Sequence, residues 1–114
     1  MKPRILAIVG PTGSGKTALA LSVARKCDGE IVSADSRQIY KYLDIGTAKP
    51  TAAERRVVKH HFIDILDPSE EFNVSHFGVE ARRVIERILK KNKIPILVGG
   101  SGLYVKAAID GLFD

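Results

Sequence analysis

The feature that most constrains this chain is a glycine-rich run at residues 10–17, which fits the pattern G-x-x-x-x-G-K-[ST]. It follows an apolar run of strand length at residues 5–9 and precedes a stretch at residues 16–27 that predicts a helix closed by Asp28-Gly29. A strand, a glycine-rich turn and a helix in this order bring backbone N–H groups and a helix N-terminus to one place. Such a place binds a di- or triphosphate.

Two side chains of this run have chemical roles of their own. We expect Lys16 to neutralise phosphate oxygens and the Thr17 hydroxyl to ligate a Mg²⁺ ion that bridges them. The phosphate-binding residues are Gly10, Pro11, Thr12, Gly13, Ser14, Gly15, Lys16 and Thr17. Kinases, ATPases and GTPases share this loop, so the loop alone leaves the reaction open.

A nucleotide hydrolase usually has, beside this loop, an apolar strand that ends in a metal-binding Asp. The apolar run at residues 96–98 ends instead in Gly99-Gly100-Ser101-Gly102. Asp35 and Asp64 both end apolar runs and could take the place of that Asp. The sequence therefore disfavours hydrolysis and leaves it open as an alternative.

The remaining chain alternates short apolar runs with amphipathic stretches. It predicts strands at residues 5–9, 31–34, 62–66 and 94–98, helices at 16–27, 52–59, 75–91 and 103–110, and a loop at 36–50. This order predicts an α/β fold, a P-loop NTPase-like parallel sheet flanked by helices on both faces, with its first strand buried on both sides. Active groups then gather at the carboxyl ends of the strands.

Length and composition exclude several classes of protein. The 114 residues can form one domain at most. Cys27 is the single cysteine, which excludes an intrachain disulfide, and no apolar run is long enough for a membrane-spanning helix. We predict a cytoplasmic protein. The three histidines have no zinc-type partners, so we expect them at the surface or in loops.

A second group of polar residues follows the strand predicted at residues 31–34. Asp35, Ser36, Arg37 and Gln38 lie at the same predicted edge as the phosphate loop. A carboxylate there can accept a proton from a nucleophile, and a Gln side chain can recognise the edge of a nucleobase. From composition alone, a turn-capping Asp at the end of a strand is an equal interpretation of Asp35.

Taken with residues 35–40, 44–50, 61–64 and 94–104, the phosphate loop makes the chain closely resemble the N-terminal part of bacterial tRNA dimethylallyltransferases, also called tRNA isopentenyltransferases. The resemblance implies transfer of a dimethylallyl group from its diphosphate to N6 of the adenine 3′ to the anticodon. The phosphate loop would then hold the diphosphate of the prenyl donor. The implied cofactor is Mg²⁺ and the implied partners are tRNA and dimethylallyl diphosphate, with no membrane and no obligate protein partner.

The resemblance also implies roles for single residues. Asp35 would be the general base toward N6, and Ser101 would hydrogen-bond the oxygen between the prenyl group and the diphosphate. With Lys16 these two form the implied catalytic set. The implied contacts to an adenine flipped out of its stack are Asp35, Ser36, Arg37, Gln38 and Ser101. Gly99, Gly100 and Gly102 would leave room for the prenyl chain. The family usually has Thr at position 101, and Ser keeps the hydroxyl.

Members of this family are roughly two to three times longer than the present chain. We therefore expect residues 1–114 to be the P-loop core of the prenyltransferase, without its tRNA-binding insertion and C-terminal part. Three alternatives stay open: a free-nucleotide (AMP) isopentenyltransferase, against which the motif at residues 44–50 argues, a small-molecule P-loop kinase, and an inactive diphosphate-binding fragment.

Overall fold

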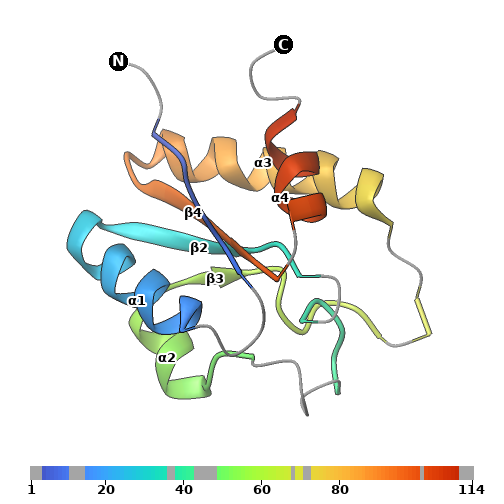
Figure 1. Cartoon of the computed structure of the whole chain (residues 1–114), viewed down its shortest axis with the longest axis horizontal. Coiled ribbons are helices and arrows are strands. Elements are labelled where there is room, and N and C mark those ends of the chain that lie inside the picture. The colour runs from blue at the N-terminus through green and yellow to red at the C-terminus, as the bar shows by residue number, and fades with distance from the viewer. Residues whose placement is uncertain are drawn as a thin grey trace.

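The computed structural model describes residues 4–10, 15–35, 38–42, 49–67, 69–70, 73–100 and 102–110. Within these ranges four strands form one parallel sheet in the order β1-β4-β2-β3 (Figure 1). The strands are β1 (Leu6–Val9), β2 (Gly29–Ser33), β3 (His60–His61) and β4 (Ile94–Gly99), and the helices are α1 (Lys16–Cys27), α2 (Ala52–Val57), α3 (Val74–Lys90) and α4 (Gly102–Asp110). The predicted order of elements is confirmed.

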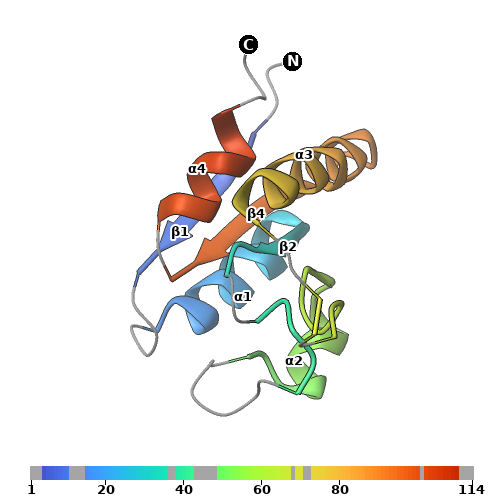
Figure 2. The ribbon, with the colours of Figure 1, turned by 90° about the vertical axis from the view of Figure 1, so that its right-hand side faces the viewer.

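Helices cover both faces of this sheet (Figure 2). On one face, α3 and α4 pack over Val32 and Leu97, and on the other, α1 packs over Ile31 and Ile96. Successive residues of a strand point to opposite faces, so each central strand contributes to both cores. The predicted α/β class, with helices on both faces, is confirmed.

Local sequence signals account for the helices well. The Asn73 side chain accepts a hydrogen bond from the backbone N–H of His76 and so caps α3, whose buried face repeats at steps of three and four: Phe77, Ala81, Val84, Ile85 and Ile88. On the opposite face, Arg83, Glu86, Arg87 and Lys90 are exposed. Thr51 and Glu54 form a capping box at the start of α2, which ends two residues earlier than predicted. Among the described helices, none combines the length and the apolar sequence that a membrane span requires.

Two strand predictions are wrong. The strand β1 is not buried on both sides: in the described part of the chain it pairs only with β4, and Leu6 and Val9 are 40% and 50% exposed. The third strand does not span residues 62–66 but consists of His60 and His61, because Phe62 and Asp64 adopt positive φ angles of 66° and 56°, which end the extended conformation. Phe62 is buried although it lies outside the strand, so its apolar character does not indicate a strand.

The prediction for two of the histidines is also wrong, since His60 and His61 are half-buried in β3. His61 Nε2 lies 2.7 Å from Oε1 of Glu30, a carboxylate that is only 2% exposed, and Lys91 Nζ lies 2.7 Å from Oε2. Burial lowers the pKa of His61 more than Glu30 raises it, so the imidazole is neutral near neutral pH and donates its Nε2–H. Burial also raises the pKa of Glu30, but the bonds and charges of Lys91 and His61 outweigh this and hold it below its ordinary value.

Candidate functional site

Three strand ends meet at one edge of the sheet. The backbone N–H of Gly10 donates to the carbonyl of Gly99 at 3.1 Å, and that of Ala34 donates to the carbonyl of Val98 at 2.8 Å. The ends of β1, β4 and β2 therefore lie side by side. The phosphate loop follows β1, the glycine-rich segment at residues 99–102 follows β4, and the polar run that begins at Asp35 follows β2. This is the common edge that the sequence predicts.

The described part of the phosphate loop is Gly10 and the end that leads into α1. Gly15 has a φ of 84° and precedes α1 directly, where it has no side chain to cap the helix. Uncapped amides at a helix N-terminus are suited to bind phosphate oxygens. Lys16 and Thr17 form the first turn of α1. The predicted phosphate-binding residues Pro11, Thr12, Gly13 and Ser14 lie outside the described residues.

A cavity beside this turn joins the two predicted groups of residues. Lys16 and Thr17 line it from α1, and Ser33, Asp35 and Gln38 line it from the end of β2 and the turn that follows. Its apolar wall includes Ala20, Ile31, Ile63 and Val98. The structure thus brings Lys16, Thr17, Asp35 and Gln38 to one cavity. Ser36, Arg37 and Ser101 lie outside the described residues.

The Asp35 carboxylate has a structural contact and a neighbour across the edge. Its Oδ1 accepts a hydrogen bond from the backbone N–H of Gln38 at 3.2 Å, and Ser33 Oγ donates to Gln38 Oε1 at 2.9 Å. A Cβ placed on Gly100 would lie 3.6 Å from Oδ2 of Asp35. Asp35 therefore does cap a turn, while its other oxygen lies next to the glycine-rich segment that follows β4.

The glycines after β4 differ in their surroundings. A Cβ on Gly99 would lie only 2.6 Å from the carbonyl oxygen of Ala34, so the close approach of β2 and β4 requires glycine there. Around Gly102 no atom lies within 4 Å of such a Cβ. Room for a prenyl chain at Gly100 and Gly102 stays a prediction, whereas Gly99 is explained by packing.

The described residues of this cavity offer few ligands for a Mg²⁺ ion. The described residues contain no group of three or more His, Cys, Asp and Glu side chains that could hold a metal ion alone. Asp64, one alternative metal ligand, is held by Lys49 and Arg55 instead. The Thr17 hydroxyl, with phosphate oxygens as further ligands, is the position that suits Mg²⁺.

Two residues in or beside the cavity, His60 and Lys49, were not among the predicted site residues. His60 lines the cavity, although we expected it at the surface or in a loop. Its Nδ1 lies 2.7 Å from the carbonyl oxygen of Val58, and burial lowers its pKa, so the ring is neutral and Nδ1–H donates. Lys49 joins segments around the same cavity, as described below. Lys49 lies in the motif at residues 44–50, but its contacts with distant residues have no signal in the local sequence.

Comparison with known proteins agrees with this geometry. The IPP transferase family profile matches residues 38–114. The chain belongs to the IPP transferase family. Among IPP transferase relatives, the tRNA dimethylallyltransferase of Carboxydothermus hydrogenoformans is 54% identical over 110 residues, which cover 96% of this chain and 35% of the relative. The chain thus spans about a third of the length of such relatives.

Solved structures of the family share the fold. The full-length tRNA isopentenylpyrophosphate transferase from Bacillus halodurans is 48% identical with a TM-score of 0.91, and the match covers 98% of this chain and 37% of that one. A eukaryotic dimethylallyltransferase acting on tRNA is 36% identical with a TM-score of 0.89, over 99% of this chain and 28% of that one. The P-loop NTPase-like fold and the family expected from the sequence are confirmed.

Proposed function

We propose that residues 1–114 form the P-loop core of a tRNA dimethylallyltransferase, which transfers a dimethylallyl group from its diphosphate to N6 of the adenine 3′ to the anticodon. One observation carries this proposal: Lys16 and Thr17 line the same cavity as Asp35 and Gln38. The first pair suits a diphosphate and the second a nucleobase. The apolar side chains of Ile31, Ile63 and Val98 along the same cavity suit a short prenyl chain.

Each residue has a defined role in this reaction. Lys16 and the N-terminus of α1 bind the diphosphate. Thr17 would help to hold Mg²⁺, which would supply positive charge that favours departure of the leaving group. N6 attacks the first carbon of the prenyl group while the bond from that carbon to the diphosphate oxygen breaks. Asp35 accepts the proton that N6 loses, and Ser101 donates a hydrogen bond to the departing oxygen.

The partner of this chemistry is tRNA. Ser36, Arg37 and Gln38 follow Asp35 directly and are proposed, with Asp35 and Ser101, to contact the flipped adenine. The names of the relatives support the substrate, because the curated relative is a tRNA dimethylallyltransferase and the eukaryotic structure is of an enzyme acting on tRNA. We place the reaction in the cytoplasm, without an obligate protein partner and without a membrane.

Nucleoside mass spectrometry tests this function. Unmodified tRNA is incubated with dimethylallyl diphosphate and Mg²⁺ in the presence of the completed protein, which we define as residues 1–114 joined to the C-terminal two thirds of the Bacillus halodurans relative. Prenylated adenosine in tRNA is the expected product, and a cooperative melting transition controls for folding. Prenylation of free AMP in place of tRNA, or transfer of the γ-phosphate of ATP, would contradict the proposal.

A further inference from the structure

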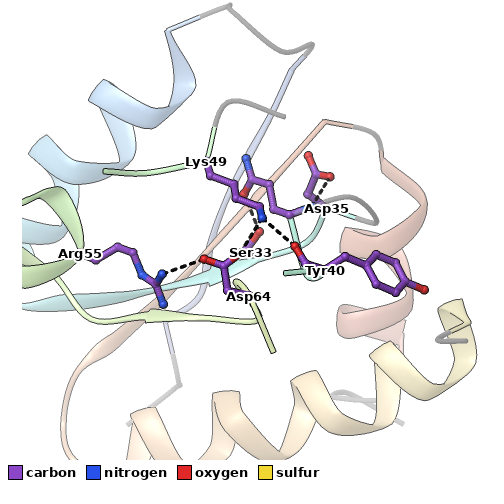
Figure 3. A network of polar contacts seen from close by, with 7 residues as sticks. Ser33, Asp35, Tyr40, Lys49, Arg55 and Asp64 are labelled. Carbon is purple, nitrogen blue, oxygen red and sulfur yellow. Dashed lines mark hydrogen bonds and ion pairs between the residues drawn. The ribbon is translucent and has the colours of Figure 1, made fainter. Parts of the chain in front are cut away.

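Lys49 is a nearly buried lysine that joins separate segments beside the cavity. Its side chain is 7% exposed, and its Nζ donates to Asp64 Oδ1 at 2.5 Å and to the carbonyl oxygen of Tyr40 at 2.6 Å (Figure 3). Arg55 Nη1 donates to Asp64 Oδ2 at 3.1 Å. One ammonium group therefore links the backbone after β2 to a carboxylate after β3.

The two linked segments also pair through their backbones. The N–H of Asp64 donates to the carbonyl of Gln38 at 3.0 Å, that of Ile65 to Ile39 at 2.9 Å, and that of Lys41 to Leu66 at 2.7 Å. Asp64 has a φ of 56°, a conformation that is uncommon for residues other than glycine. Lys49 thus bonds to both paired segments, next to a residue with a positive φ.

Gln38 connects this pairing to the cavity. Its side chain lines the cavity and accepts a hydrogen bond from Ser33, and its backbone N–H is the donor to Asp35 Oδ1. Movement of residues 38–41 would therefore displace both Gln38 and the turn that orients Asp35. Lys49 is not itself among the described residues that line the cavity, so an effect of Lys49 on the site would have to pass through these neighbours.

We propose that Lys49 is a positioning residue, which holds residues 38–41 and thereby keeps Gln38 and Asp35 oriented for the adenine. This inference rests on the proposed function. It concerns only the acceptor half of the site. Binding of the diphosphate, which depends on Lys16 and the N-terminus of α1, should not need Lys49.

Two matched variants distinguish the positioning role of Lys49 from the mere loss of an ion pair to Asp64. Lys49→Met keeps the length of the side chain and removes both the ion pair to Asp64 and the bond to the Tyr40 carbonyl. Arg55→Met removes the other cation bound to Asp64, and Arg55, whose side chain is 38% exposed, has no bond to Tyr40 among the described contacts. Of the two variants, only Lys49→Met removes a described side-chain link between the two segments.

Amide hydrogen exchange on residues 1–114 is the first test. In Lys49→Met, the amides of Lys41 and Ile65 should exchange about ten- to a hundredfold faster, as expected for loss of hydrogen bonds to a charged group. Amides of α1 and β4 and the affinity for pyrophosphate should stay at wild-type values. Arg55→Met should leave all of these unchanged. Equal effects of both variants, or faster exchange throughout the molecule in Lys49→Met, would overturn the proposal.

Kinetics of the completed protein are the second test. Lys49→Met should lower kcat for tRNA about ten- to a hundredfold and leave KM for dimethylallyl diphosphate unchanged, whereas Arg55→Met should stay within about threefold of wild type. In Lys49→Met, a rise of KM for dimethylallyl diphosphate by the same factor as the fall of kcat would refute a role confined to the acceptor half. If the wild-type completed protein does not prenylate tRNA, the proposed function fails, and hydrogen exchange alone then decides whether Lys49 holds the two segments.

Discussion

Replacement of Glu30 by alanine should destabilise the fold far more than loss of a surface ion pair. Glu30 is 2% exposed and accepts hydrogen bonds from His61 and Lys91, both at 2.7 Å. The bond from half-buried His61 to a charged acceptor contributes about 1.5–3 kcal/mol. Lys91 is 47% exposed, so solvent screens its ion pair to about 1 kcal/mol or less. We expect Glu30→Ala to lower the free energy of unfolding by about 2–3 kcal/mol, or about 8–12 °C in Tm.

Urea denaturation near neutral pH measures this loss. The control is Glu80→Ala, which removes an exposed ion pair to Arg83 on the surface of α3 and should change stability by at most about 0.5 kcal/mol. If Glu30→Ala is too unstable to fold, Glu30→Gln keeps the size and one acceptor and should cost about half as much. Loss of stability in both Glu30 variants no larger than in Glu80→Ala would refute the reasoning.

Two further predictions concern pH and phosphate binding. Because burial lowers the pKa of His60 and His61 below the ordinary 6.5, the unfolded chain binds protons that the folded chain does not, so the free energy of unfolding should fall as pH drops below about 6.5. Urea denaturation between about pH 7.5 and 5 should show this fall, with a smaller slope in His61→Gln; a flat profile would contradict it. Lys16→Ala should weaken pyrophosphate binding about ten- to a hundredfold in a calorimetric titration, while Lys26→Ala, at the other end of α1, should not. Equal pyrophosphate affinities of these two variants would contradict the assignment of Lys16 to a phosphate-binding loop.

The helices were predictable because their signals are local. The apolar residues of α3 repeat along one stretch, and its cap, Asn73, lies next to its first turn. The capping box of α2 involves Thr51 and Glu54, three residues apart. Propensity, periodicity and caps all act within a few residues, so the sequence shows them directly.

The errors in the sheet arose from properties that depend on distant residues. Among the described strands β1 lies at the end of the strand order, and the apolar pattern of a single run does not contain that order. His60 and His61 form a strand because they pair with Ile31 and Val32 in β2, and the apolar residues after them turn away at Phe62. A short apolar run predicts burial, but it does not show which strands it pairs with or whether it is a strand at all.

In the candidate site, too, features with local motifs could be predicted and contacts between distant residues could not. The phosphate loop and Asp35 could be recognised from short motifs that follow predicted strands. Lys49 meets Asp64 across 15 residues of sequence, and His61 meets Glu30 across 31, so neither contact has a local pattern. Such pairs form only once the topology has brought the strands together.

The most direct test of the proposed chemistry is the single-turnover rate of Asp35→Asn in the completed protein, at saturating tRNA and dimethylallyl diphosphate. Asparagine keeps an oxygen that can accept the Gln38 N–H, now bound by Asp35 Oδ1 at 3.2 Å, so the turn should persist. It cannot accept the N6 proton. We predict unchanged pyrophosphate affinity and thermal stability, with a rate about 10²–10⁴-fold lower. A rate equal to that of the wild type would show that Asp35 only caps the turn and that the base lies elsewhere.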